Sequence, residues 1–229
     1  MKIGILIFDQ MTQLDATGPF EVLARIPGAT VLLVAKRKRP VTAQFGLTLL
    51  PHTDLRRCPR LDVICVPGGN GLNDLLLDDE VLDFVRRQSK SAKFTTSVCT
   101  GSLLLGAAGL LQDKRAACHW ASLPLLAAFG AKPSLKRVER DGRFITAGGV
   151  TSGIDFGLWV AAKLAGLKAA KKIQLMLQYD PRPPFRAGTP RKAGPALTAS
   201  IVRASAKSRA LRVELVERAA SRLRQYHPR

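Results

Sequence analysis

Residues 94–111, which read FTTSVCTGSLLLGAAGLL, join a buried strand to an apolar helix with only Cys-Thr-Gly between them. The strand is predicted over 94–98 and the helix over 102–111, so Cys99 lies in the turn. A strand that passes straight into a helix is typical of an open α/β sheet, where functional sites form beyond the carboxyl ends of the strands. This stretch therefore predicts both the class of the fold and the place of a site.

The neighbouring segments repeat the alternation of strand and helix. Continuous apolar runs, as expected for a sheet covered on both faces, occur at 2–8, 29–35 and 61–66, and a short strand is predicted at 114–118. Helices are predicted at 19–25, 79–88, 119–129 and 151–163, the first with Pro19 in its opening turn. Hairpins are predicted over 41–50 and 137–147. This order indicates a mainly parallel sheet with helices on both faces.

Length and composition limit the architecture. The chain has 229 residues, of which 46% are apolar, and this suits one full α/β domain with a short extension. We assign residues 1–190 to the domain and 191–229 to a basic C-terminal extension. A proline-rich linker at 180–195 leads to a predicted amphipathic helix at 199–226, with an inner stripe formed by Leu211, Leu215, Ala219 and Leu223.

Membrane spans and metal sites are not expected. No apolar run reaches the ~18–20 residues that cross a bilayer, and the first strand meets Asp9 too early for a signal peptide. The four cysteines, at 58, 65, 99 and 118, lack the spacing of a zinc site and do not indicate a disulfide framework. The sequence predicts a soluble, cytoplasmic protein that binds no metal.

The net charge of +19 is concentrated toward the C-terminal end. Residues 163–229 hold 16 of the 36 basic residues but only 3 of the 17 acidic ones. Such a stretch fits either contact with nucleic acid or a solvated basic surface. No aromatic residues alternate with the basic ones as a platform for stacked bases requires. We therefore favour the solvated surface and do not expect nucleic acid as a partner.

Cys99 is the strongest candidate for chemistry. A thiol at the start of a helix lies near free backbone N–H groups and the positive end of the helix dipole, which lower a cysteine pKa from ~8.5 toward ~3.5–7.5. The sequence thus predicts a reactive thiolate, the alternative being a buried apolar side chain. Asp15 can approach Cys99 across the strand ends, where partial burial raises a carboxyl pKa. The alternative for Asp15 is a helix cap.

Two weaker signals lie at other strand ends. Gly68 and Gly69 follow the third strand, where their N–H groups can approach a bound anion or simply form a tight turn. His119 is either a base for the thiol or a core histidine. The sequence has no phosphate loop, dinucleotide-binding fingerprint or metal-ligand cluster.

Familiar motifs cover most of residues 1–190. They lie at 9–23, 66–69, 97–111, 119–120, 146–155, 173–185 and 187–190. Together they resemble the ThiJ/PfpI superfamily of class I glutamine-amidotransferase-like proteins, and within it the isonitrile hydratases most closely. The resemblance implies a flavodoxin-like sheet, a homodimer, and a nucleophile at Cys99 with its acidic partner at Asp15 and a hydroxyl at Thr100. PfpI-type peptidases have Cys-His where this chain has Cys99-Thr100, and relatives that act on glyoxals usually have glutamate at the Asp15 position.

The implied reaction is hydration of an isonitrile, R–N≡C, to an N-substituted formamide, a lyase reaction without metal or organic cofactor. The Cys99 thiolate attacks the terminal carbon, and Asp15 supplies a proton. A water that Asp15 activates and Thr100 helps to hold then hydrolyses the thioimidate. Gly68, Gly69 and His119 are the expected substrate-binding residues.

Three other interpretations remain open. The chain could be another cysteine enzyme of the superfamily, such as a glyoxalase or deglycase. It could be a non-catalytic sensor of a ligand, or of oxidants through a sulfenic acid at Cys99. It could also be a regulator of the AraC type, although the about 35 residues after Pro195 are too few for paired helix-turn-helix motifs.

Overall fold

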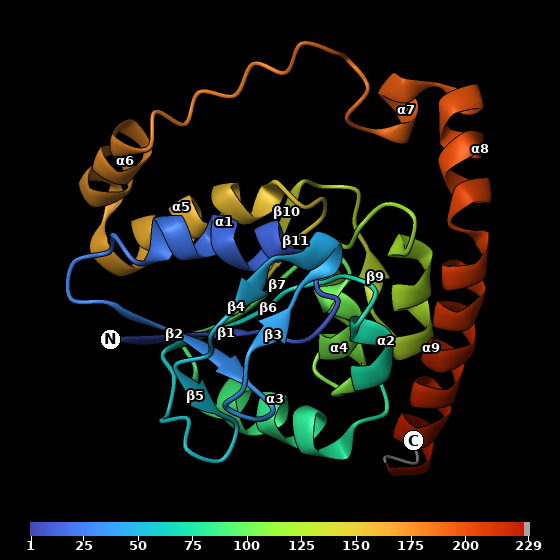
Figure 1. The fold of residues 1–229 in the computed structure, drawn as a ribbon, viewed down its shortest axis with the longest axis horizontal. Helices are drawn as coiled ribbons and strands as arrows, with labels where there is room; N and C mark the ends of the chain where they lie inside the picture. The colour runs from blue at the N-terminus through green and yellow to red at the C-terminus, as the bar shows by residue number, and fades with distance from the viewer. Residues whose placement is uncertain (227–229) are drawn as a thin grey trace.

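A seven-stranded sheet forms the centre of the computed structural model, which describes residues 1–226 (Figure 1). In sheet order the strands are β10 (Val138–Asp141), β11 (Phe144–Ala147), β7 (Phe94–Val98), β6 (Val63–Val66), β1 (Lys2–Leu6), β2 (Thr30–Ala35) and β5 (Thr53–Asp54). Neighbouring strands are parallel except β10, which is antiparallel to β11. The predicted mainly parallel α/β sheet is confirmed.

Helices cover both faces of this sheet (Figure 1). Helices α1 (Gln13–Leu23) and α5 (Ser152–Ala165) pack together on one face, with α6 (Leu167–Met176) against α5. Helices α3 (Asp79–Ser91) and α4 (Gly101–Ala107) cover the other face. A Cβ atom on Gly153 of α5 would lie 3.0 Å from the Cδ of Pro19 in α1. The glycine therefore lets the two helices approach closely.

The order of the strands reverses beside β1, which creates the crevice for a site. From β1 the chain extends to β2 and β5 on one side, then returns to add β6, β7, β11 and β10 on the other. In open α/β sheets, ligands bind outside the carboxyl ends of the strands at such a switch point. Asp15 follows β1, Gly68 follows β6 and Cys99 follows β7, so the three positions share this edge.

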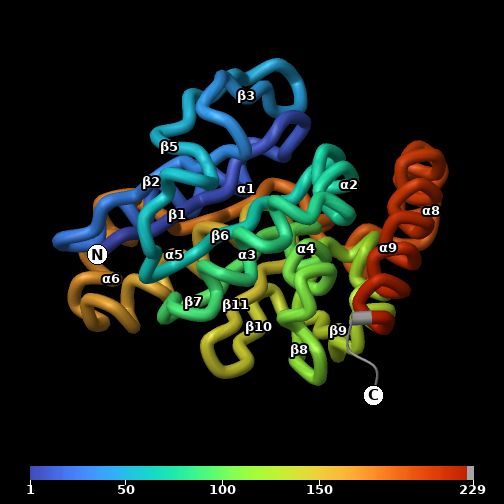
Figure 2. Tube along the Cα trace, turned by 90° about the horizontal axis from the view of Figure 1, so that it is seen from below, coloured from blue at the N-terminus to red at the C-terminus, as the bar shows by residue number. Residues whose placement is uncertain are grey.

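The smaller elements lie outside the central sheet. Strands β3 (Val41–Thr42) and β4 (Thr48–Leu49) form a hairpin around the short 3-10 helix η1 (Gln44–Gly46), and Figure 2 shows the β3 segment projecting from the sheet. Helix α2 (Leu72–Leu75) follows β6. Strands β8 (Arg115–Ala116) and β9 (Lys132–Pro133) flank the 3-10 helix η2 (Leu123–Phe129). The hairpins predicted over 41–50 and 137–147 are confirmed.

Some predicted boundaries are wrong. Helix α1 begins at Gln13, so Pro19 lies inside it and lacks the N–H that a helix interior donates to the carbonyl four residues earlier. The helix predicted from His119 is only the 3-10 segment η2, which begins beside Pro124, a residue favoured in a first turn. The sequence patterns also missed α6 and the two-residue strand β5.

The C-terminal extension contains three helices instead of one. They are α7 (Pro190–Ala193), α8 (Pro195–Ala204) and α9 (Ala206–Tyr226); residues 227–229 lie outside the described part. The linker after α6 crosses the molecule to reach them (Figure 1), and α9 packs beside α2 and α4. The predicted inner stripe is partly wrong, because Leu211 is 49% exposed while Arg212, Val216 and Ala220 are buried.

Within residues 1–226, no helix has both the length and the apolar character needed to span a membrane.

Candidate active site

Cys99 occupies a strained turn between β7 and α4. Its φ of 58° lies in the left-handed region, which is uncommon for a residue with a side chain. Two backbone bonds hold it there: its N–H donates to the Ala147 carbonyl (2.9 Å), and its carbonyl accepts from the His119 N–H (3.2 Å). A Cβ at Gly101 would lie 2.0 Å from the Val66 carbonyl oxygen, so this turn requires glycine next to Thr100. The sharp turn predicted from the sequence is confirmed.

Asp15 lies in the first turn of α1 and is fully buried. Its Oδ2 accepts a hydrogen bond from the Gly68 N–H (2.9 Å), whereas its Oδ1 has no partner with full hydrogen-bond geometry among the described residues. Burial raises the Asp15 pKa from 3.8 to about 7, against smaller lowering effects of the Gly68 N–H and the Cys99 thiol. The proton-carrying carboxyl expected from the sequence is thus present. Asp15 does not cap α1, whose N-cap residue is Thr12.

The pKa of Cys99 shifts in the direction opposite to the sequence prediction. Burial of the thiol and the negative charge of Asp15 raise it well above its ordinary value, and the Thr100 N–H and the more distant Arg212 charge lower it less. Loss of solvation therefore outweighs the helix N-terminus. The sequence prediction of a lowered Cys99 pKa is therefore wrong in direction, and burial opposes ionisation of the sulfur and of the Asp15 carboxyl alike.

Cys99 and Asp15 consequently titrate as a pair. Below about pH 7 the pair holds two protons, and above it one proton that the two groups share. The unpartnered Asp15 Oδ1 leaves an acceptor beside the thiol. The singly protonated pair can therefore move its proton from sulfur to carboxylate when the sulfur attacks a carbon.

Thr100, Gly68 and Gly69 form the surroundings of this pair. The Thr100 Oγ1 accepts from the Gly69 N–H (3.0 Å) instead of capping α4. The N–H groups of Gly68 and Gly69 are thus occupied by Asp15 and Thr100, and both glycines position the side chains of the site. Their direct contact with a substrate stays a prediction.

Replacing Gly68 by alanine is expected to lower kcat about 10²-fold, the cost of a displacement near 1 Å at a reacting group. The new Cβ would lie 2.5 Å from the Thr100 N and Oγ1 and 3.0 Å from the Cys99 Cβ, so these atoms must move. Gly188→Ala is the control, since a Cβ there meets nothing within 4 Å. Steady-state kinetics should separate the two variants, and equal rates would contradict this role of Gly68.

The pair lies at the base of a cavity of about 220 Å³. Its lining includes Cys99, Thr100, Gly69 and His119. The other lining residues come from the β3–β4 hairpin, from the β11–α5 turn, from α8 and α9, and from the loops beside α1, α2 and η2 and between α8 and α9: Thr12, Gln44, Asn70, Ala121, Val150, Ile201, Ser205, Ser208, Arg209 and Arg212. Burial and the Arg212 charge lower the His119 pKa, which keeps the ring neutral. The His119 Nδ1 accepts from the Ala121 N–H (3.4 Å), and no hydrogen bond joins the ring to Cys99 within residues 1–226.

Comparison with known proteins gives the family. The DJ-1/PfpI family model matches residues 1–163. The chain belongs to the DJ-1/PfpI family. It is 51% identical to an isonitrile hydratase of Pseudomonas putida, over 97% of this chain and 98% of that protein. The family fold is also evident in the crystal structure of a ThiJ/PfpI family protein from Pseudomonas syringae, which has a TM-score of 0.91 and 40% identity and covers 94% of this chain and 90% of that one.

A more distant relative is named for a different activity. A glutathione-independent glyoxalase of Caenorhabditis elegans is 27% identical over 64% of this chain and 78% of that protein. The similarity to the Pseudomonas putida protein is stronger in identity and covers more of both chains. It also includes the C-terminal extension, which lies beyond the matched family model.

The main site residue that the sequence analysis missed is Arg212 of α9. Its guanidinium donates to Asn73 Oδ1 (3.0 Å), Ser122 Oγ (3.3 Å) and the Gly69 carbonyl (3.3 Å). The sequence pattern allows two inner faces for this helix. One face has Leu211, Leu215, Ala219 and Leu223, which the sequence analysis favoured, and the other has Arg212, Val216, Ala219 and Leu223 at equally good helical spacing.

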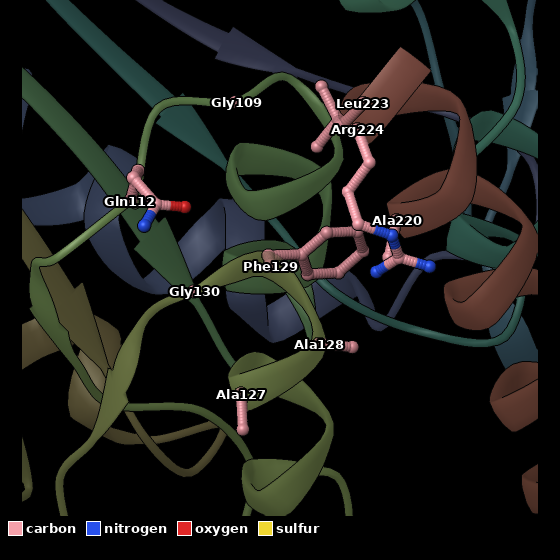
Figure 3. Close-up of a pocket in the computed structure, with 9 residues that line it drawn as sticks. All are labelled: Gly109, Gln112, Ala127, Ala128, Phe129, Gly130, Ala220, Leu223 and Arg224. Atoms are coloured by element: carbon pink, nitrogen blue, oxygen red, sulfur yellow. The ribbon is translucent and has the colours of Figure 1, made fainter. Parts of the chain in front are cut away.

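A separate pocket lies at the other end of α9 (Figure 3). It has a volume of about 540 Å³ and is bordered by residues of α9, of η2 and of the segment after α4, among them Phe129, Gln112 and Arg224. None of its lining residues belongs to the predicted site. We therefore place the chemistry at the switch-point cavity.

Proposed function

We propose that this protein is an isonitrile hydratase, a lyase that converts R–N≡C and water into an N-substituted formamide. The observation that carries the proposal is the 51% identity to the Pseudomonas putida enzyme over nearly all of both chains. The local chemistry supports it, because a thiol and a hydroxyl line one small cavity and a buried carboxyl of pKa about 7 lies next to the thiol. This is the set of groups that a covalent addition and hydrolysis requires.

In the first half-reaction the Cys99 sulfur forms a bond to the terminal carbon of the isonitrile. The S–H bond breaks, and its proton passes through Asp15 to the same carbon, which contributes the electron pair for the new C–H bond. The product is a thioimidate, Cys99–S–CH=N–R. Asp15 therefore acts first as base and then as acid, a role that fits a carboxyl whose pKa lies near neutrality.

In the second half-reaction water adds to the thioimidate carbon. The Thr100 hydroxyl holds the water oxygen, while Asp15 takes a proton from this water and passes it to the substrate nitrogen. The C–S bond then breaks, the formamide leaves, and the proton from the adduct hydroxyl returns to sulfur through Asp15. One water is consumed and no electrons are exchanged, so the sequence balances without an oxidant or reductant.

The pH dependence follows from the protonation of the pair. The active form carries one proton, so kcat/KM should rise with pH through an apparent pKa of about 7, where Asp15 loses its proton. Below that value each pH unit costs about tenfold, because Asp15 can no longer accept the thiol proton. The rate should stay level to well above pH 7, since burial holds the Cys99 pKa high. A kcat/KM that declines from pH 6 to pH 8 would contradict this assignment.

The test of the function is an assay with two substrates. Purified protein should form N-cyclohexylformamide from cyclohexyl isonitrile, measured by chromatography, and should leave methylglyoxal unchanged. Consumption of methylglyoxal without formamide production would replace the proposal by the glyoxalase alternative. The assay distinguishes the two functions clearly, because an isonitrile and methylglyoxal share no functional group.

Oxidant sensing is a weaker alternative for Cys99. The thiolate is the form that oxidants attack, and burial with a negative neighbour keeps this thiol protonated. Cys99 should therefore react slowly with mild peroxide. Mass spectrometry that found rapid sulfenic acid formation at neutral pH would favour the sensor instead.

We also propose a cytoplasmic homodimer. Four cysteines that form no disulfide fit a reducing compartment. Large apolar side chains are exposed along α6 and the linker after it: Leu167, Leu175, Met176 and Phe185. Exposed apolar groups of this size favour a protein interface. Light scattering coupled to size exclusion should give twice the mass of the 24.8 kDa chain, and a monomer would contradict the proposed dimer.

A further inference from the structure

The cavity above Cys99 has a cationic wall made by Arg209 and Arg212 of α9. The Arg212 side chain is buried, with 7% of the residue exposed, and Arg209 is half-buried. Both arginines also line a smaller adjoining cavity of about 80 Å³. The wall therefore faces the space that a substrate attached at Cys99 would occupy.

Neither arginine is paired with an acid in the described part of the chain. Arg212 donates only to neutral oxygens, those of Asn73, Ser122, Gly69 and Asn70. Across residues 1–226, no carboxylate forms an ion pair with Arg212 or Arg209. Leaving a buried charge without an opposite charge is costly, and many other arginines of this chain do have acidic partners.

The rest of the cavity wall supplies no opposite charge. Apart from the two arginines, its side chains are apolar, hydroxyl, amide or the Cys99 thiol, and the ring of His119 is neutral because burial lowers its pKa. Asp15 lies below the cavity and is not part of its lining. The surface offered to a small molecule is thus a thiol at the base and a positive charge on one side.

The guanidinium N–H groups of Arg209 and Arg212 suit a carboxylate ligand. A guanidinium has five N–H groups, and four contacts of Arg212 leave one N–H on its Nη1 free within the described structure. The Arg209 guanidinium makes no hydrogen bond to the described residues and can turn toward the cavity. Two such groups can hold the two oxygens of one carboxylate.

We propose that the substrate of this enzyme is an isonitrile that carries a carboxylate, with its –N≡C carbon at Cys99 and its carboxylate at Arg209 and Arg212. The inference rests on the proposed function and names the substrate class of that site. The carboxylate takes no part in the chemistry, so the balanced reaction is unchanged. If the two groups share a carbon, the product is an N-formyl amino acid.

The test compares a matched pair of substrates, potassium isocyanoacetate and methyl isocyanoacetate, which differ in charge at one end. Wild-type protein should have a kcat/KM for the carboxylate at least about tenfold higher than for the ester, because hydrogen bonds to a charged group are stronger than those to a neutral one. The difference should lie mainly in KM, since the contact is the same before and during the reaction.

Variants of Arg209 and Arg212 then test whether these residues cause the preference for the carboxylate over the ester. Arg209→Gln should reduce the carboxylate-to-ester ratio of kcat/KM about tenfold, and Arg212→Lys should reduce it as well. Arg203→Gln is the matched control, because it removes the same charge from an exposed position on α8 outside the cavity and should leave the ratio unchanged. An Arg212 that only positioned the Gly69 loop would lower kcat for both substrates equally.

The outcomes separate this inference from the proposed function. Hydration of the ester without preference for the carboxylate, or a ratio that Arg209→Gln leaves intact, overturns the carboxylate site while the hydratase remains. Hydration of cyclohexyl isonitrile without hydration of either isocyanoacetate overturns the inference alone, whereas absence of hydration of all three compounds overturns the hydratase as well. Calorimetric binding of N-formylglycine, a product, gives a second readout: wild-type should bind it more tightly than its amide, and Arg209→Gln should not.

Discussion

Formamide production is expected to fall at least about 10⁴-fold when Cys99 is replaced by alanine, which is the scale of losing the nucleophile of a covalent mechanism. Alanine keeps the Cβ of the strained residue, so the turn between β7 and α4 loses only the sulfur. The loss should therefore appear in kcat without a matching change in thermal stability. Steady-state kinetics and a melting curve measure the two quantities on the same sample.

The control for this variant is Cys58→Ala. Cys58 is a half-buried thiol beside Pro59 and does not line the cavity, and its loss should leave the rate unchanged. Intact-mass spectrometry during turnover should also find wild-type protein heavier by the mass of one isonitrile, and no such species for Cys99→Ala. A Cys99→Ala enzyme within tenfold of wild-type activity would show that the sulfur forms no bond to the substrate.

Replacing Asp15 by asparagine is expected to lower kcat/KM by about 10²–10⁴-fold while making the fold more stable. The amide oxygen can still accept from the Gly68 N–H, but the amide cannot relay a proton between sulfur and carbon. The rate loss should be accompanied by loss of the rise in activity near pH 7. An Asp15→Asn variant that keeps this rise would assign it to another group.

The stability gain depends on pH in a defined direction. The Asp15 pKa is raised from 3.8 to about 7 in the folded state, so the folded protein binds the proton more tightly than the unfolded chain does. The contribution of Asp15 to wild-type stability therefore decreases as pH rises from about 4 to about 7, by up to ~4 kcal/mol. Asparagine resembles the protonated form, so the variant should melt higher than wild type above pH 7 and at the same temperature below pH 4.

The sequence was sufficient to predict the centre of the site. Cys99 could be placed because a strand and a helix meet there with three residues between them, and this local pattern leaves one possible geometry. Asp15 could be placed near it because the ends of parallel strands share an edge. The raised pKa of Asp15 then follows from burial, which any residue at the base of a covered crevice experiences.

What the sequence could not predict depends on segments distant along the chain. The direction of the Cys99 pKa shift depends on how much water remains near the sulfur, and α8 and α9 limit that water because they line the cavity above it. Arg212 lies 143 residues from the Gly69 carbonyl that it contacts. No local periodicity distinguishes a buried arginine from the solvated ones around it on a helix as basic as α9.

The bond between Arg212 and Gly69 also has a consequence for biosynthesis. A nascent chain that has emerged only through residue 190 contains the thiol, the carboxyl and the whole sheet, but not the cationic wall or the helix that holds the Gly69 loop. Such a ribosome-bound intermediate has an open, hydrated crevice. Docking of α9, and not assembly of the central sheet alone, therefore completes the site.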